Sequence, residues 1–272
     1  MIGAVVYRLQ AQERGILPAF TGRLMHGVFF DVLRRFSNNL SCAIHGDSGE
    51  KPFTVSPLRS ESPLSSCGHY GTEWAVPAGA SFLWRATGMN ESILEGMGSL
   101  KKGDILRAGQ LTLQVEQVMP SARDHDRAGM LDENDLIAAC LSVEEIHSLS
   151  FHFLSTLSFR KGNDDFPFPL PRYIFGSLVR KWNMLQAVSF DAETVEKEAD
   201  HLPVLSWKGR SQRIYLGRDR GVLAFAGDIT FDMSPLPLEK RQLFLLLAQF
   251  AAFSGVGRLT AQGLGETTIS YR

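Results

Sequence analysis

The segment that decides the fold lies near the C-terminus and reads Gly255-Val256-Gly257-Arg258-Leu259-Thr260-Ala261-Gln262-Gly263-Leu264-Gly265. It follows an apolar stretch that predicts a helix over residues 238–253, and it precedes an alternating stretch that predicts a closing strand over 267–271. Glycine permits positive φ and a close approach of the backbone to a ligand. Consecutive amides can then point together at phosphate oxygens. The predicted phosphate-binding residues are Gly255, Gly257, Arg258, Thr260, Gly263 and Gly265.

Other glycine-rich motifs do not match this segment. No Gly-Lys-Ser/Thr follows at the spacing of a nucleotide-binding P-loop. The glycines follow a helix and precede a strand, which is the reverse of a dinucleotide-binding fingerprint. The alternative is a helix C-cap with a tight turn, which needs only one or two glycines.

Working outward, the second half of the chain predicts a strand, a helix, a hairpin, a helix and a strand. Leu149, Phe151 and Phe153 alternate with polar residues as in a half-buried strand. A Pro-rich turn at 166–171 precedes an amphipathic helix that contains Ile174, Phe175, Leu178, Trp182 and Leu185. A hairpin is expected over 211–231, turning near Arg220-Gly221.

The first half predicts the same order of elements. A strand is expected at 5–10, a helix from Thr21 to Phe36, a loop over 37–57 with a short strand at 53–55, strands at 81–86 and 110–119, and a helix at 90–100. This order is the split βαβ pattern of a ferredoxin-like domain. We therefore predict an α+β chain of two tandem ferredoxin-like (RRM-like) domains with antiparallel sheets, at 1–120 and 141–272, joined by a linker at 121–140.

Composition limits the class of protein. The chain has 272 residues, 44% of them hydrophobic and 21% charged, which is ordinary for a globular protein of two domains. No run reaches the ~20 apolar residues that span a bilayer. No secretory signal is recognisable, so we expect a cytoplasmic protein without membrane contact. Three scattered cysteines and histidines without HExxH spacing indicate no disulfide framework, metal centre or cofactor.

The net charge of −1 argues against a basic field over the whole protein. The basic residues are instead concentrated locally. Lys208, Arg210, Arg213, Arg218 and Arg220 fall within thirteen residues that hold one acid, and Arg160-Lys161 follow a predicted strand. We predict RNA phosphate contacts from Lys208, Arg210, Arg213, Arg160 and Lys161; a solvated hairpin is the alternative.

The glycine-rich segment after a helix at the C-terminus resembles the signature loop of the repeat-associated RNA-binding superfamily. Within it the sequence is similar to the CRISPR repeat-processing endoribonucleases, the family numbered six among the Cas proteins. Shorter matches agree and span both halves: Leu17-Pro18 before Gly22-Arg23-Leu24, Ile44-His45-Gly46, Lys51-Pro52-Phe53-Thr54-Val55-Ser56-Pro57-Leu58, and Phe168-Pro169-Leu170-Pro171.

The resemblance implies metal-independent processing of CRISPR repeat transcripts. In such a reaction the RNA 2′-hydroxyl attacks the adjacent phosphorus and leaves a 2′,3′-cyclic phosphate. It needs a base, an acid and a cation, and histidine suits the proton transfers. The family places its catalytic histidine where His45 stands, with His26 as partner and Lys51 as the phosphate-stabilising cation. The tyrosine that the family often carries on the first helix is replaced by Phe29-Phe30-Asp31.

Two other hypotheses remain open at this point. The chain is alternatively a non-catalytic RNA scaffold of a CRISPR effector complex, which has no need of His45 or Lys51. It is otherwise an unrelated α+β protein whose glycine loop binds a phosphorylated small molecule. The implied partner is CRISPR repeat RNA or its processed product, and effector-complex subunits or a second copy of the chain are further candidates.

Overall fold

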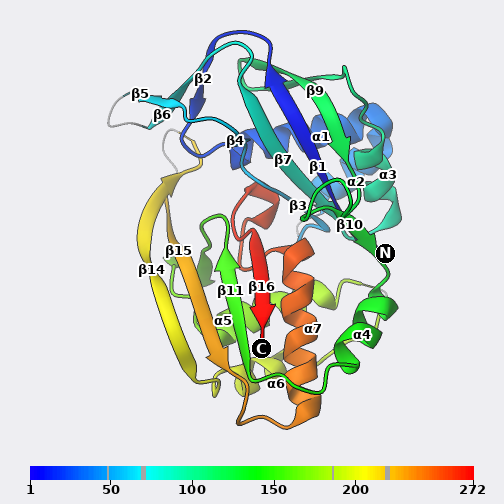
Figure 1. Ribbon diagram of the computed structural model, residues 1–272, viewed down its shortest axis with the longest axis vertical. Coiled ribbons are helices and arrows are strands. Elements are labelled where there is room, and N and C mark those ends of the chain that lie inside the picture. The colour runs from blue at the N-terminus through cyan, green and yellow to red at the C-terminus, as the bar shows by residue number, and fades with distance from the viewer. Residues whose placement is uncertain (48, 69–71, 186, 218–220) are drawn as a thin grey trace.

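A computed structural model describes residues 1–47, 49–68, 72–185, 187–217 and 221–272. It shows two antiparallel sheets, each covered by helices, with one sheet above the other in Figure 1. The central strands run β9-β1-β7-β3 in the first sheet and β16-β11-β15-β14 in the second. In both halves this is the fourth, first, third and second strand of a βαββαβ unit. The predicted pair of ferredoxin-like domains is therefore confirmed.

The first sheet is built on β1 (Ile2–Ala11), which lies between β7 (Ser81–Gly88) and β9 (Leu111–Met119). Its edges carry shorter strands: β3 (Phe53–Val55) and β4 (Arg59–Ser60) on β7, β8 (Ile105–Ala108) on β9, and β10 (Gly129–Leu131) on β1. A separate small sheet holds β2 (Gly15–Pro18), β6 (Glu73–Val76) and β5 (Ser65–Cys67).

Helices α1 (Gly22–Phe36), α2 (Asn38–Gly46) and α3 (Glu91–Gly98) accompany the first sheet. The predicted apolar stripe of α1 is buried at Met25, Val28, Phe29, Val32 and Leu33. These side chains form one core with the buried face of β1, as their helical spacing predicts.

The second sheet is built on β11 (Ser148–Phe153), between β15 (Gly221–Asp232) and β16 (Thr267–Tyr271). β14 (Val204–Tyr215) forms its outer edge. Helices α5 (Pro171–Trp182) and α7 (Leu238–Ser254) pack on the face that contains Phe151 and Phe231. Helix α6 (Ala192–Ala199) lies against α5, and the hairpin β12 (Phe159–Lys161) and β13 (Asp164–Phe166) precedes α5.

Several expectations need correction. Residues 38–46 are helical rather than a loop, because the Ser37 hydroxyl caps α2 by accepting from the Leu40 amide at 3.3 Å. The predicted linker 121–140 contains β10, which extends the first sheet, and α4 (Glu133–Leu141), which Asp132 caps. Strand β2, which lies between the first predicted strand and the first predicted helix, was not predicted.

The hairpin of the second half begins earlier than expected, at Val204. The predicted turn near Arg220-Gly221 includes residues outside the described part of the chain. Two of the cations singled out above, Arg218 and Arg220, also lie outside it. Helix α6 and the β12–β13 hairpin were not predicted. No helix in the described residues is both long and apolar enough to cross a membrane.

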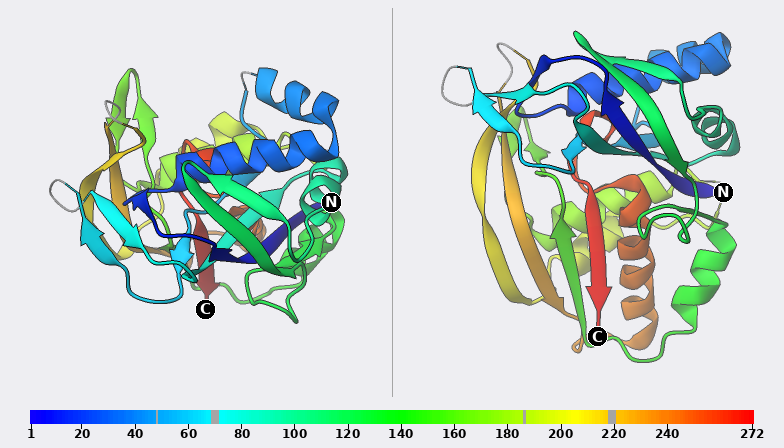
Figure 2. Two further views of the ribbon diagram at one scale, coloured as in Figure 1. Left: turned by 90° about the horizontal axis from the view of Figure 1, so that it is seen from above. Right: turned by 45° about the horizontal axis from the view of Figure 1, so that its top comes forward.

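The two halves meet at the C-terminal end of α7, which is coloured orange-red in Figure 1 and lies beneath the first sheet in both further views of Figure 2. Arg85 from β7 donates to Ala252 O at 2.7 Å, and Thr87 donates to Phe253 O at 2.7 Å. The last carbonyls of a helix lack intrahelical partners, and burial without partners is costly. Residues of the first half therefore complete a helix of the second.

Lys181 on α5 supplies the remaining donors. Its side chain is fully buried, and its ammonium lies 3.2, 3.1 and 2.9 Å from the carbonyls of Ser254, Gly255 and Gly257 and 3.3 Å from Thr260 Oγ1. Burial lowers the pKa of Lys181 to about 8. The surrounding oxygens favour the charged form, so the group is an ammonium at neutral pH.

Lys181→Met should lower the free energy of unfolding by about 3 kcal/mol, because it leaves buried oxygens without donors. Urea denaturation checks this. Lys197→Met, at an exposed lysine paired with Glu193 on α6, is the matched control and should change stability by no more than about 0.5 kcal/mol. Equal stability of the two variants would contradict a structural role for the buried ammonium.

Candidate RNA-cleavage site

Two of the predicted catalytic histidines converge on one aromatic ring. The ring of His26, on α1, lies 4.9 Å from the centroid of Phe30, and the ring of His45, in the last turn of α2, lies 5.1 Å from the same centroid. His26 is half-buried and also stacks on Phe53 at 5.9 Å, whereas His45 is exposed. The α1–α2 corner therefore brings together residues that are nineteen positions apart.

The glycine-rich segment fixes the orientation of His26. Nδ1 of His26 lies 2.7 Å from the carbonyl oxygen of Ala261. A carbonyl only accepts, so Nδ1 carries the proton and Nε2 of the neutral ring has a free lone pair. Burial lowers the pKa of His26, and the nearby His45, Lys51 and Arg23 lower it further, against the opposing effect of the Ala261 hydrogen bond. His26 is therefore a neutral proton acceptor at pH 7.

Lys51 lies beside the histidines, but its ammonium is engaged. It donates to the carbonyls of Ile44 (2.8 Å), His45 (3.4 Å) and Asp47. These bonds use all three protons and satisfy the end of α2, where a cation also complements the helix dipole. In this structure Lys51 holds His45 in place, and its role as a phosphate-binding cation stays a prediction.

Arg23 is a cation of the site that the sequence reasoning did not select. It is exposed, lies one helical turn before His26, and is one of the charges that lower the pKa of that histidine. Within the described part of the chain it donates to Leu216 O at 3.3 Å, a long hydrogen bond. The spacing of three residues on an amphipathic helix was the signal that could have identified it.

The glycine-rich segment does not present a phosphate cradle. Its glycines are buried. The amides of Val256, Gly257, Arg258 and Gly265 donate to Gly265 O, Ser177 Oγ, Ser158 O and Thr156 O respectively. Gly255, Gly257, Gly263 and Gly265 all have positive φ, which explains the requirement for glycine. All four amides are therefore occupied by groups of the second half, and the phosphate cradle that we expected from them stays a prediction that these bonds do not support.

Two polar side chains of the segment are also engaged. Arg258 forms an ion pair with Asp165 of β13, and Thr260 accepts from Lys181. Direct RNA contacts from Gly255, Gly257, Arg258, Thr260, Gly263 and Gly265 stay a prediction. What the segment offers the site is the carbonyl of Ala261.

The other predicted RNA-binding side chains are exposed. Lys208, Arg210 and Arg213 lie on β14, the outer strand of the second sheet, beside Trp207, which is 55% exposed and packs on Phe225 at 6.0 Å. Arg160 and Lys161 lie on β12 and line a separate pocket. Both groups are therefore accessible to a large anion, and their contact with RNA stays a prediction.

The fold defines a protein of two ferredoxin-like domains, with the two histidines at the α1–α2 corner of the first. Two family models match the chain: the CRISPR Cas6 N-terminal domain over residues 3–123 and the CRISPR-associated endoribonuclease Cas6 over residues 151–267. Together they cover most of its length. The chain belongs to the Cas6 endoribonuclease family.

Solved structures agree with this fold. A Cas6 product complex is 24% identical, with a TM-score of 0.79 over 99% of this chain and 100% of that one. A second Cas6 product complex is 22% identical (TM-score 0.74; 99% of each chain), and Thermus thermophilus Cas6 is 23% identical (TM-score 0.73; 99% and 98%). No curated protein sequence matches the chain.

The start of α1 touches the glycine-rich segment closely. A Cβ on Gly22 would overlap the carbonyl oxygen of Gln262 and lie 2.9 Å from Cα of Gly263. Neither backbone can yield without moving Ala261, which lies between Thr260 and Gln262 and anchors His26. Close backbone approach thus couples α1 to the segment.

Gly22→Ala should therefore destabilise the fold by at least about 1 kcal/mol and weaken the hydrogen bond from His26 to Ala261. Thermal unfolding and the NMR titration of the His26 ring check this. Gly27→Ala on the same helix is the matched control: nothing lies within 4 Å of its Cβ position, so it should stabilise α1 by about 0.5–1 kcal/mol. The same sign of change in both variants would contradict the proposed contact.

Proposed function

We propose that this chain is a metal-independent endoribonuclease that cleaves CRISPR repeat RNA by attack of a 2′-hydroxyl on the adjacent phosphorus, leaving a 2′,3′-cyclic phosphate and a 5′-hydroxyl. Family membership supports the RNA-cleaving activity. The observation that carries the mechanism is the convergence of His26 and His45 on Phe30, with Nδ1 of His26 fixed by Ala261 O.

His26 serves as the general base. Its hydrogen bond to Ala261 leaves Nε2 as the accepting atom, and its lowered pKa keeps it neutral at pH 7. Removing the 2′-hydroxyl proton generates the attacking oxygen, so no external nucleophile is required. General acid–base catalysis by positioned groups contributes about 10²–10⁴-fold in rate.

His45 serves as the general acid that protonates the departing 5′-oxygen. It is exposed at the end of α2, where Lys51 holds its backbone carbonyl. Arg23 supplies the cation for the negative charge that develops on the phosphorane, because its guanidinium is exposed on the His26 side of α1. The cations of β14 and β12 would bind RNA outside the cleaved phosphate.

Labelled CRISPR-repeat RNA should be cut at one position by the wild-type protein in EDTA, and the product should end in a cyclic phosphate. His45→Ala and His26→Ala should each lower the single-turnover rate by about 10²–10⁴-fold while RNA binding persists. His201→Ala, at an exposed histidine of the second half, is the matched control and should cut as the wild type does. Gel assays and mass spectrometry of the ends measure both quantities.

Binding without cleavage by the wild type would instead identify an RNA scaffold. Cleavage that EDTA abolishes and added metal restores would overturn the metal-independent mechanism. Failure to bind repeat RNA would remove the proposed substrate. Retained cleavage in both histidine variants would place the chemistry elsewhere.

The pH dependence follows from the neutral form of His26. A base is active when unprotonated, and burial holds the pKa of His26 below the ordinary value of 6.5. The acidic limb of the single-turnover rate, where His26 gains a proton, should therefore lie below about pH 6.5. Arg23→Gln removes one cation that depresses this pKa and should move the acidic limb towards higher pH. A limb centred above 6.5 in the wild type would contradict the assignment of His26 as base.

A further inference from the structure

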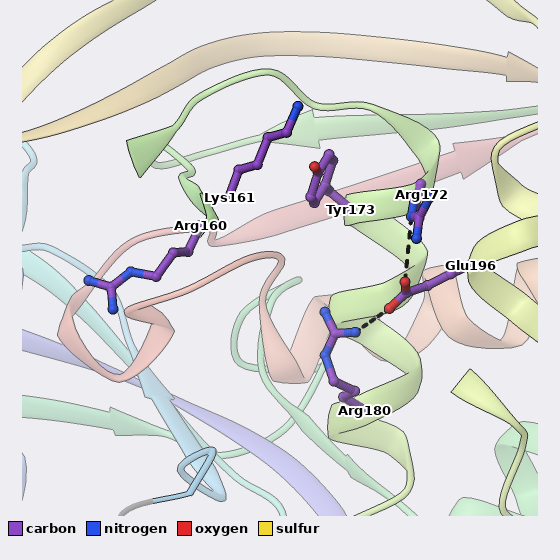
Figure 3. A pocket seen from close by; sticks show the side chains of 6 residues that line it. All are labelled: Arg160, Lys161, Arg172, Tyr173, Arg180 and Glu196. Carbon is purple, nitrogen blue, oxygen red and sulfur yellow. Dashed lines mark hydrogen bonds and ion pairs between the residues drawn. The ribbon is translucent and has the colours of Figure 1, made fainter. Parts of the chain in front are cut away.

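A second cluster of cations surrounds a pocket of about 480 Å³ in the C-terminal half. Its lining comes from the β12–β13 hairpin and from helices α5 and α6, and Figure 3 shows all of the side chains. They are Arg160, Lys161, Arg172, Tyr173, Arg180 and Glu196. The lining thus carries four cations and one carboxylate. A pocket with this balance of charge takes an anion.

The one carboxylate positions two of the cations. Arg172, Gly176 and Arg180 are spaced by four residues on α5 and therefore share one face. Glu196 reaches across from α6 and lies over Gly176, where an added Cβ would come within 2.6 Å of its Oε1. Arg180 pairs with this carboxylate directly, and Arg172 lies 3.6 Å from it, as the dashed lines in Figure 3 show.

Both arginines keep donors for a ligand. A guanidinium has five N–H groups in a planar fork, and Glu196, together with Asp200 at 3.8 Å from Arg172, uses only a fraction of those of the two arginines. Their side chains are about half exposed. Glu196 thus orients the two arginines, whose remaining N–H groups can bind a further anion in the planar, bidentate geometry that arginine prefers.

The hairpin adds two cations that lack an ion-pair partner among the described residues. Asp165, which lies opposite Arg160 in the hairpin, is taken by Arg258 of the glycine-rich segment. Lys161 is opposite Asp164, but its recorded contact is with the ring of Phe166 at 5.8 Å. Both side chains are exposed and free to meet a ligand.

The pocket is connected to the histidine site through the glycine-rich segment. Lys181, the residue after Arg180, donates to Thr260, and the neighbouring Ala261 accepts from His26. Glu50, beside Lys51, raises the pKa of Lys181, which places the α2–β3 connection close to the end of α5. The pocket and the histidine site are therefore linked through one segment of the chain.

We infer that this pocket binds a backbone phosphate of the RNA strand outside the cleaved position. The inference rests on the proposed function and extends it, because it assigns Arg172 and Arg180 as RNA contacts and Glu196 as the residue that positions them. The pocket holds no part of the reacting phosphate. It contributes to binding and leaves the chemical step unchanged.

The test compares Arg172→Gln/Arg180→Gln with Lys102→Gln/Arg107→Gln, which removes two exposed cations from the first half. The binding probe is repeat RNA with 2′-deoxy substitutions, which lacks the attacking hydroxyl. The pocket variant should raise Kd at least about tenfold, as expected for lost charge-assisted hydrogen bonds. It should also reduce the slope of log K against log salt by about one.

Cleavage of unmodified RNA at saturating protein should proceed at the wild-type rate in the pocket variant. A Kd and salt slope equal to those of the control variant would overturn the pocket assignment while leaving the proposed function intact. A reduced rate at saturation would place these arginines in catalysis and also overturn it. If the wild type neither binds nor cuts repeat RNA, the proposed function itself fails, so the two failures are distinguishable.

Discussion

The buried C-terminal end of α7 is the constraint on which the rest of the structure depends. A helix end leaves carbonyls without partners, and here that end lies between two domains where water cannot supply them. Arg85 and Thr87 from the first sheet and Lys181 from α5 donate to Ala252, Phe253 and Ser254. Two cations at a helix C-terminus also complement its dipole. Because the donors belong to both halves, completing one helix fixes how the two domains sit against each other.

The glycine-rich segment follows this end of α7 and connects it to His26. Its carbonyls accept from Lys181, while Glu266, directly after its last glycine, pairs with Arg59 and with Arg127 at 2.6 Å. Glycines are required because the chain turns through positive φ beneath α1. As a result, the carbonyl oxygen of Ala261 is held where it accepts from Nδ1 of His26 and so sets the tautomer of that ring. One segment therefore accepts both from Lys181, which completes α7, and from His26.

Periodicity and turn residues were enough to predict the fold, because both halves repeat an order of strands and helices that local patterns reveal. Two examples are the alternation of buried and partly buried side chains along β11 and the apolar stripe of α1. Helix α2 was missed because Ser37-Asn38-Asn39 is equally typical of a turn, and only the cap on Leu40 decides between them. The glycine segment was singled out for its glycines, and its RNA contacts stay a prediction, because four of its amides are already bonded within the protein. The sequence shows that a glycine backbone can adopt positive φ. It does not show that the amides of this backbone are already hydrogen-bonded to other parts of the protein.

The histidine pair was found by resemblance, whereas the surrounding cations illustrate what a sequence conceals. Lys51 and Arg23 are both isolated cations in the sequence. The side chain of Lys51 donates to carbonyls at the end of α2, whereas Arg23 is exposed beside His26. A net charge of −1 likewise hides the distribution that matters. Acids are used to orient cations: Asp165 holds Arg258, and Glu196 holds Arg180. A guanidinium already fixed by a carboxylate loses less conformational entropy when it binds phosphate. An acidic side chain in a basic pocket can therefore favour an anionic ligand, and charge counting alone would assign it the opposite effect.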